Sequence, residues 1–433
     1  MKRPFNQLLC FLCLSVLPVG GWAQTLRAAP PQASQAQALS LRELLEAAAS
    51  QNPDIRAARL AAQANAQDVT AVERLRWPSL SLTAESDTGN NRTTPNTALQ
   101  VEQTLYDFGQ LSARIAGAKT EASTGLLRMH LQQQDVYLQI IGAWQSLLGA
   151  QQRAQVARDT LQRLDGFVAQ MTRRVESKAS APIDLELVQA RVLQTEVELS
   201  TAQNAASIAL NRIEQLTGLS GVAPRLDGLD PAPWQTQAQA FATELDSIDW
   251  VRQASQSSLV AKARLDVERA RTDYQLVVAQ NFPTLYLRSY QPLSKEASGV
   301  PLNTSMTTFF GLRYSPGAGF VTAAQAQSMQ TRLSSVEEKV RSATQEMLQI
   351  MRSDREEFMN ARLRQTALAQ SVKGSANVLD SYKRQFDANR KTWLDLMNAV
   401  RELAQNEYAW VDAQTAAVGA MLRLQVRLGR NPQ

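Results

Sequence analysis

Few residues of this chain could carry catalysis or bind a transition metal. The 433 residues include one histidine, His130, and two cysteines, Cys10 and Cys13. Histidine and cysteine are the usual transition-metal ligands, and a catalytic nucleophile needs a neighbouring base. His130 lies in a long helical pattern, where we expect a packed or solvent-facing side chain, and Gly317-Ala318-Gly319 is better explained as a turn than as a phosphate loop. The sequence therefore predicts that the protein is not an enzyme and holds no cofactor or metal.

The N-terminus has the features of a secretory signal peptide, residues 1–23. Lys2 and Arg3 precede the apolar stretch 8–19, which is too short to span a bilayer, and Gly21-Trp22-Ala23 is a small-x-small cleavage site. The alternative is an uncleaved anchor. Both cysteines lie inside this segment, and neither follows the small residue that a lipoprotein signal requires. We therefore expect neither a lipid anchor nor a disulfide in the mature chain.

The composition is typical of long helices and coiled coils. Hydrophobic residues make up 44% of the chain, but aromatic residues only 6%. The formal net charge of +5 includes Lys2 and Arg3 and is otherwise spread along the chain, which gives no indication of nucleic-acid binding. After residue 23 no run of about 18 apolar residues occurs, so we predict no transmembrane helix.

The chain contains an internal repeat. Residues 50–80 align without a gap with residues 255–285, and Trp77-Pro78 corresponds to Phe282-Pro283. The period, about 200 residues, is far longer than the 20–50 residues of a solenoid unit. Further along, Asp184-Leu185 corresponds to Asp395-Leu396. The sequence therefore predicts two similar halves fused in one chain.

The first repeat, residues 40–218, follows an expected disordered lead, residues 24–39. Ser40 and Glu43 form a capping box at its start. The predicted elements are a helix to about residue 76 with an irregularity at Asn52-Pro53, strands 80–84 and 99–105 around a polar loop 87–96, a helix 109–175, a turn 178–182 and a helix 183–217. More than sixty residues of helix would be about 100 Å long, which no globular domain requires.

The second repeat has the same plan. An inter-repeat linker, residues 219–243, is rich in proline and glycine and contains Trp234. The second repeat spans 244–429 and a tail covers 430–433. Its predicted elements are a helix 244–281, a strand 285–290, a loop 291–303, a strand 307–314, a turn 316–319, a helix 321–388, a turn 389–391 and a final helix to residue 428.

The helix 183–217 carries a coiled-coil seam. Apolar or small residues recur at alternating spacings of three and four, which is the left-handed coiled-coil pattern. The positions are Leu185, Val188, Val192, Thr195, Leu199, Ala202, Ala206, Ala209, Ile213 and Leu216. The many small residues indicate close helix packing, and a generic amphipathic bundle helix is the alternative.

Four short strands per chain cannot close a barrel with a lumen, and open strand edges are not tolerated in lipid. If the strands span a membrane, the chain must therefore oligomerise, and three copies would supply twelve strands. The helices would form a continuous cylinder below them. We thus predict a mostly α fold with a small β part and an internal two-fold repeat.

In this layout the chain resembles the TolC-type outer-membrane export channels, over about residues 39–429. The shared motifs are Asn52-Pro53, Trp77-Pro78, Leu105-Tyr106-Asp107-Phe108-Gly109 and Leu216-Thr217-Gly218. The resemblance implies a homotrimer in the outer membrane, with a twelve-strand transmembrane β-barrel and an α-barrel of antiparallel coiled-coil helices reaching into the periplasm. It also implies docking to a periplasmic adaptor protein and an inner-membrane transporter, either an ABC exporter or a proton-driven pump.

The resemblance further implies a gate where the two hairpin turns of each chain meet. By alignment of the turns, Lys391 corresponds to a latch base, Asp184 to its acidic partner and Asp395 to a pore-ring aspartate. Asn398 stands at a second ring position, where an acid would bind cations more strongly. The alternative is that Asp184 and Asp395 only begin their helices favourably against the dipole. The turn residues expected to dock the adaptor are Lys178, Ala179, Ser180, Ala181, Asn389 and Arg390.

Two function hypotheses follow. The first is a channel that passively conducts substrates in efflux or type I protein secretion. The turn Tyr314-x-Pro316-Gly317-x-Gly319 loosely resembles channels that export large adhesins. The second is a periplasmic coiled-coil adaptor or scaffold, which would have one helical hairpin flanked by β-rich domains. The paired strand segments in each repeat favour the channel.

Overall fold

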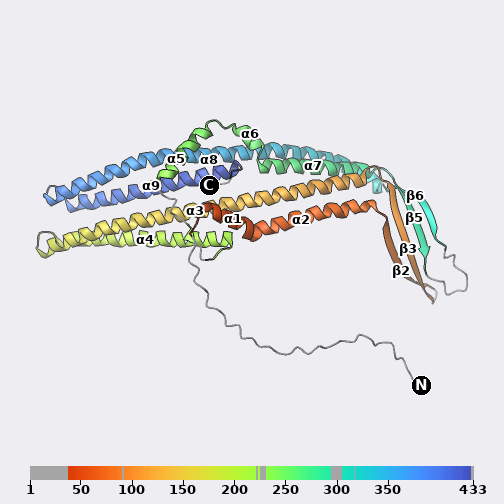
Figure 1. Cartoon of the computed structure of the whole chain (residues 1–433), viewed down its shortest axis with the longest axis horizontal. Coiled ribbons are helices and arrows are strands. Elements are labelled where there is room, and N and C mark those ends of the chain that lie inside the picture. Colours follow the sequence, from red (N-terminus) through yellow and green to blue (C-terminus); the bar gives the residue numbers. More distant parts are fainter. Residues whose placement is uncertain are drawn as a thin grey trace, which may run out of the picture.

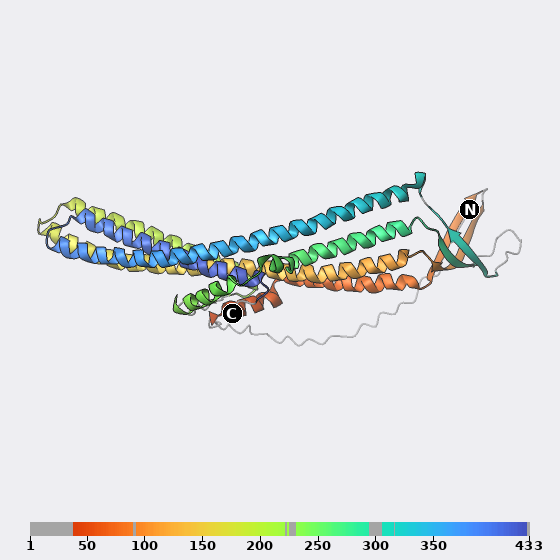
Figure 2. The ribbon, with the colours of Figure 1, turned by 90° about the horizontal axis from the view of Figure 1, so that it is seen from above.

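The computed structural model describes residues 38–89, 92–220, 223–224, 231–293, 305–315 and 317–430. The molecule is long, with helical hairpins at one end and a four-stranded sheet at the other (Figures 1 and 2). Within these ranges, no helix is both long and apolar enough to cross a bilayer. The predicted signal peptide 1–23, most of the lead 24–39 and residues 431–433 of the tail lie outside the described residues.

The first repeat has the predicted order of elements. Ser40 caps the first helix through a capping box with Glu43, as the sequence predicted. The elements are α1 (Leu41–Gln51), α2 (Pro53–Glu73), the 3₁₀ turn η1 (Arg74–Arg76), β2 (Ser79–Gly89), β3 (Arg92–Tyr106), α3 (Gln110–Glu176) and α4 (Pro182–Thr217). A short strand β1 (Ala38–Leu39) precedes them and pairs with β4 (Ala223–Pro224).

The second repeat matches the first over its strands and long helices. Its elements are α5 (Pro231–Leu245), α6 (Trp250–Ser255), α7 (Ser258–Ala279), β5 (Thr284–Pro292), β6 (Thr307–Arg313), the 3₁₀ turn η3 (Ala318–Phe320), α8 (Val321–Asp387) and α9 (Trp393–Arg427). The helices α3 and α8 each have 67 residues, about 100 Å at 1.5 Å per residue. Figure 2 shows α8 running from the sheet end to the far tip.

One prediction in the second repeat was wrong. The helix expected at 244–281 is interrupted, because Asp249 and Ser257 each accept backbone N–H bonds and begin new helices, α6 and α7. The expected linker 219–243 contains most of helix α5, which packs Phe241 against Phe358 with ring centroids 5.6 Å apart. Proline is tolerated in the first turn of a helix, so the prolines of this linker can begin one.

The loop predicted at 87–96 was also wrong. Strand β2 continues to Gly89 and β3 begins at Arg92, in antiparallel register. The segment is polar but contains Thr88, Thr93 and Thr94, and β-branched threonines favour strands. Residues 90–91 lie outside the described residues, as do 294–304 of the second predicted loop.

The motif 105–109 turns the chain from β3 into α3. Asp107 accepts backbone N–H bonds from Gly109 at 3.1 Å and from Leu111 at 2.6 Å, and so caps the helix. Phe108 and Gly109 have φ angles of 52° and 94°, a left-handed stretch that glycine adopts without strain. The Phe108 ring stacks on Phe282, which stands where the other repeat has Trp77, at 5.2 Å. The motif is therefore a joint between the sheet and the helices.

The sheet has the order β2-β3-β5-β6 and is antiparallel throughout. Paired residues share a face and alternate residues lie on opposite faces, so the register assigns a face to the side chains of residues 79–84, 97–104, 284–292 and 307–313. One face is largely polar, with Ser79, Ser81, Gln100, Glu102, Arg288, Tyr290 and Thr307. The other is largely apolar, with Leu80, Leu82, Leu99, Val101, Leu287 and Phe310. The apolar face lacks a cover in the single chain, since Leu82 and Phe310 are 64% and 70% exposed.

The helical part has two main cores. One lies at mid-length, where α1 packs on α3 and α4, and includes Leu44, Ile140 and Ile213. The other lies near the tip and joins α3, α4, α8 and α9. The predicted seam of α4 is confirmed, because all ten of its positions are buried or half-buried. The seam packs α4 against α3 as an antiparallel pair, and α8 packs against α9 in the same way.

Asn52 ties the break between α1 and α2 to the end of α4. Its side-chain oxygen accepts from the N–H groups of Asp54, at 2.9 Å, and Ile55, at 3.2 Å. Its amide donates to the Leu216 carbonyl at 2.8 Å, and the residue is buried. The motifs Asn52-Pro53 and Leu216-Thr217-Gly218 thus meet in space.

We predict that Asn52→Ala lowers the free energy of unfolding by about 2 kcal/mol per chain, because it removes a helix cap and leaves the buried Leu216 carbonyl unpaired. Asn52→Ser keeps a capping oxygen and should cost about half as much. Thermal melting followed by circular dichroism measures both. Equal losses in the two variants would show that the cap contributes nothing.

Candidate functional site

The turns α3–α4 and α8–α9 lie near each other at the end of the molecule farthest from the sheet (Figure 1). Both have the same backbone, with a left-handed residue just past the first helix: Lys178 at φ 58° and Asn389 at φ 56°. In each, the N–H of the next residue donates to a carbonyl five residues back, as in a Schellman motif. These bonds run from Ala179 to Arg174, at 2.7 Å, and from Arg390 to Gln385, at 2.8 Å.

Most of the predicted docking-turn residues are exposed. Lys178, Ala179, Ala181, Asn389 and Arg390 all face solvent, and Ser180 is half-buried. Four of these residues lie on the first turn and two on the second, at the same end of the molecule.

Arg174, which the sequence analysis did not single out, joins the two turns. Its Nε donates to the Ser180 hydroxyl at 3.1 Å and its terminal nitrogen to Asn389 at 3.4 Å. Its guanidinium also lies over the Phe386 ring, 4.8 Å from the centroid. The position of the first turn relative to the second therefore depends on this arginine. An arginine in the last turn of a helix is too common for the sequence alone to mark it.

Trp393 makes the second connection between the hairpins. Its ring lies 5.9 Å from that of Phe167 on α3 and 5.2 Å from that of Phe386 on α8. Its indole N–H donates to the backbone carbonyl of Asp184 at 2.9 Å. The residue is 4% exposed, so a turn residue is part of the tip core. A tryptophan beside a polar turn is the feature of the sequence that could have indicated this contact, because a buried indole needs a partner for its N–H.

Asp395 caps α9. Its carboxylate accepts from the Thr392 hydroxyl at 2.8 Å and the Thr392 N–H at 3.2 Å, while the Asp395 N–H donates back to that hydroxyl. This is the helix-starting role that the sequence analysis held as the alternative. The hydrogen bonds from Thr392 hold the pKa of Asp395 below its usual value, and Lys391 nearby acts in the same direction. The carboxylate is therefore kept ionised, as a pore ring would also require.

The expected latch pair is not formed inside one chain. Lys391 lies 3.9 Å from Asp395 and over the Tyr382 ring, at 4.4 Å. No ion pair joins Lys391 to Asp184 within the part of the chain that the structure describes. Asp184 is half-buried in the first turn of α4 and meets α9 only through its backbone. Asn398 is half-buried one turn into α9.

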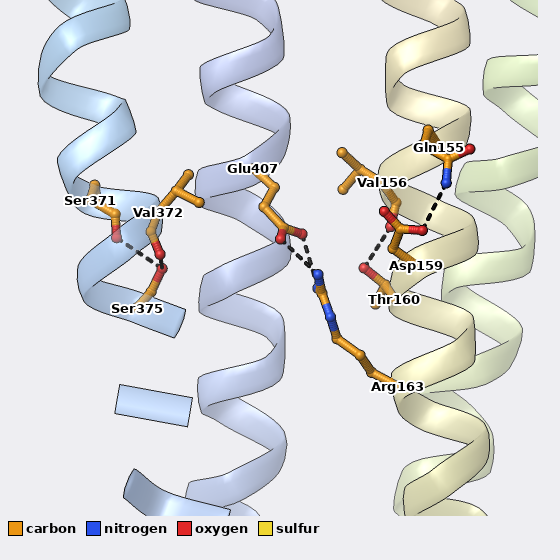
Figure 3. Close-up of polar contacts among 9 residues, drawn as sticks. All are labelled: Gln155, Val156, Asp159, Thr160, Arg163, Ser371, Val372, Ser375 and Glu407. Atoms are coloured by element: carbon orange, nitrogen blue, oxygen red, sulfur yellow. Dashed lines mark hydrogen bonds and ion pairs between the residues drawn. The ribbon is translucent and has the colours of Figure 1, made fainter. Parts of the chain in front are cut away.

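Above the tip, a charged pair bridges the hairpins (Figure 3). Arg163 of α3 makes two hydrogen bonds to Glu407 of α9, at 2.8 and 3.0 Å. Hydrogen bonding to Glu407 raises the pKa of Arg163 above its usual value. A cavity of about 350 Å³ lies beside the pair and is lined by residues of α3, α8 and α9. Among the described residues, no three acidic, histidine or cysteine side chains are grouped as metal ligands would be.

We predict that Lys178→Gly stabilises the helical tip by about 1 kcal/mol, because lysine pays the cost of a left-handed backbone that glycine avoids. Asn389→Gly should gain less, since asparagine tolerates this conformation. Amide hydrogen exchange of the last turns of α3 and α8 measures both. Slower exchange in Asn389→Gly than in Lys178→Gly would contradict the argument.

Comparison with known proteins agrees with this fold. Residues 44–219 match the family model of the outer membrane efflux proteins. No curated protein sequence matches the chain. The family is one of channel proteins and not of enzymes, in agreement with the prediction.

Solved structures of similar fold cover nine-tenths of the chain. A membrane protein from Pseudomonas aeruginosa has 18% identity and a TM-score of 0.76, over 90% of this chain and 92% of that one. VceC, an outer membrane protein from Vibrio cholerae, has 16% identity and a TM-score of 0.75, over 90% and 96%. The open state of MtrE, an outer membrane channel from Neisseria gonorrhoeae, has 15% identity and a TM-score of 0.72, over 90% and 89%.

The matched family model and the similar structures are those of outer-membrane proteins, which is the location that the sequence predicted. Residues 44–219 are thus similar to the outer membrane efflux proteins, and the chain as a whole has the fold of the TolC-type outer-membrane channels.

Proposed function

We propose that three copies of this chain form one passive exit duct through the outer membrane. The observation that carries the proposal is the sheet, which has one apolar face without a cover and two open edges, β2 and β6. In lipid every backbone hydrogen-bonding group must be paired within protein. Joining β6 of one copy to β2 of the next pairs all edges when the ring closes, and three copies give a barrel of twelve strands.

The two faces of the sheet fit this arrangement. Leu80, Leu82 and Phe310 lie on the face that would contact lipid, and Ser81, Gln100 and Arg288 on the face that would line the lumen. Burying exposed leucine and phenylalanine in hydrocarbon is favourable by about 25 cal/mol per Å² of apolar area. A periplasmic adaptor or scaffold would gain nothing from an apolar sheet face, so the observation favours the duct over that alternative.

The helices extend the duct on the periplasmic side. Helices α3 and α8 are far longer than a bilayer is thick, so the tip lies well away from the membrane. The tip surface, residues 178–181 with Asn389 and Arg390, is then placed to receive an adaptor protein, and through it an inner-membrane exporter. The duct itself supplies no energy, so the substrate is driven by that transporter.

The family description favours efflux of substrates over export of a dedicated protein. The turn after β6 is the feature that favours export of a dedicated protein. Gly317 and Gly319 have φ angles of 74° and 60°, so the turn needs its glycines, while Pro316 lies outside the described residues. We retain type I secretion of a large adhesin as the second candidate on that ground.

The trimer can be tested by joining strand edges with cysteines. We predict that Ser81→Cys on β2, combined with either Thr307→Cys or Phe309→Cys on β6, gives disulfide-linked dimers and trimers in isolated outer membranes. The control pair Gln100→Cys and Tyr290→Cys lies on adjacent inner strands in register, so it should link within one chain only. Monomers alone from every edge pair would overturn the trimer.

We propose that Asp184, Lys391, Asp395 and Asn398 surround the entrance at the tip. Lys391→Ser should raise conductance in planar bilayers, since it removes charge pairing around Asp395. One exposed pair contributes about 0–1 kcal/mol, so the effect depends on three copies acting together. Unchanged conductance would place the gate elsewhere.

The role of Asp395 in a cation-binding ring can be tested separately from its role in the helix cap. Asp395→Ala should weaken block by divalent cations, whereas Thr392→Ala disrupts the cap but keeps the carboxylate and the block. Because the Thr392 hydrogen bonds lower the pKa of Asp395, block should persist below the usual titration range of an aspartate and fail only as pH falls through the lowered value. Equal loss of block in both variants would assign Asp395 to the cap alone.

A further inference from the structure

The polar face of the sheet carries a compact charged cluster near the helical end. Glu102 on β3 accepts from Arg288 on β5 at 2.7 Å and from Arg313 on β6 at 3.1 Å. Glu102 is paired with Ser79, the first residue of β2, and Arg313 is the last residue of β6. The cluster therefore crosses three of the four strands at the end where they leave the helices.

Tyr286 fixes the two arginines in place. The Arg313 guanidinium lies 4.7 Å from the centroid of its ring and that of Arg288 lies 5.0 Å away. Tyr286 is opposite Gly311 in the register, and a Cβ at Gly311 would collide with the end of the tyrosine ring. Glycine at this position of a strand thus leaves room for the ring to lie across β6, close to both guanidinium groups. The arrangement is a built cluster and not a chance surface ion pair.

The cluster has an excess of positive charge. In the strand segments 79–84, 97–106, 284–292 and 307–313, whose side chains the structure describes, Glu102, Arg288 and Arg313 are the charged residues. Two guanidinium groups share one carboxylate, which leaves one unit of positive charge per chain. Polar residues surround it on the same face, and the apolar face is on the other side of the sheet.

We propose that Glu102, Arg288 and Arg313 of three chains form a ring of net charge +3 inside the duct, where the barrel meets the helices, and that this ring favours the passage of anionic solutes. The proposal rests on the trimeric duct proposed above. A fixed charge acts over about one Debye length, roughly 10 Å at 0.1 M salt, so the preference is for small anions near the wall and for anionic groups on larger solutes. Tyr286 and Gly311 are positioning residues for the two arginines.

The test is the reversal potential of reconstituted trimers across a KCl gradient of about 0.1 M mean concentration, at which the charges still act over roughly 10 Å. Arg313→Gln and Arg288→Gln should each lower the permeability ratio of chloride to potassium, because each takes the ring from +3 to 0. Glu102→Gln should raise the ratio, because it takes the ring to +6. Each substitution changes the ring by three charges, but the arginine variants and the glutamate variant shift the ratio in opposite directions.

Two controls isolate the ring charge. Arg313→Lys keeps the charge and should keep the wild-type ratio of chloride to potassium permeability. Arg42→Gln removes an exposed positive charge on α1, away from the sheet, and should keep that ratio too. All shifts should vanish near 1 M KCl, where the Debye length falls to about 3 Å. Recovery of each variant as a trimer from outer membranes shows that it has folded.

The outcomes separate the two proposals. If wild-type trimers do not conduct, the duct itself is refuted, and the ring with it. If they conduct but the ratio is the same in Arg313→Gln, Glu102→Gln and wild type, the duct stands and the ring is refuted. A shift in one direction for both variants would also refute it, since a change of pore shape and not of charge would then be the cause.

Discussion

The rest of the structure depends on one constraint. The sheet of a single chain can neither pair the backbone hydrogen-bonding groups at its edges nor cover its apolar face. Four strands leave the hydrogen-bonding groups of β2 and β6 unpaired and expose an apolar face that includes Leu82 and Phe310. An exposed apolar sheet with open edges would aggregate in water and is not tolerated in lipid. In the duct proposed above, assembly with identical copies pairs the open edges, and lipid covers the apolar face. The aromatic joint of Phe108 on Phe282 then sets how the helices leave the sheet.

The far end of the molecule solves a different problem, that of holding two long hairpins together around the tip core that they share. Trp393 and Arg174 do so with contacts that cross between hairpins, one through a buried ring and one through hydrogen bonds at the surface. The ion pair of Arg163 with Glu407 adds a third link higher up. The contacts of Trp393 are aromatic and buried, whereas those of Arg174 and Arg163 are polar. The polar contacts can therefore break while the core of the tip stays packed.

The sequence predicted what depends on local patterns. The Ser40 capping box, the seam of α4 and the length of α3 follow from periodicity and capping residues, which act over a few neighbours. The errors arose where a residue type has two uses. Polar threonines, for example, indicated a loop at 87–96 but extend β2 and β3. Contacts between distant residues, such as Arg174 with Asn389, have no local pattern and could not be predicted.

The repeat shows how one backbone can serve two chemical purposes. Both hairpin turns have the same left-handed residue and the same helix-ending hydrogen bonds. Only the second has a side-chain cap, from Thr392, and a buried tryptophan; the first enters α4 at Pro182 without a side-chain cap. Proline supplies the helical φ that the cap would otherwise stabilise. The first turn is thus stiffened through its backbone and its exposed side chains are unconstrained, whereas the second is fixed by side chains that also carry charge. In the docking site and cation ring proposed above, both turns therefore supply the docking surface, and the second supplies Asp395 of the ring.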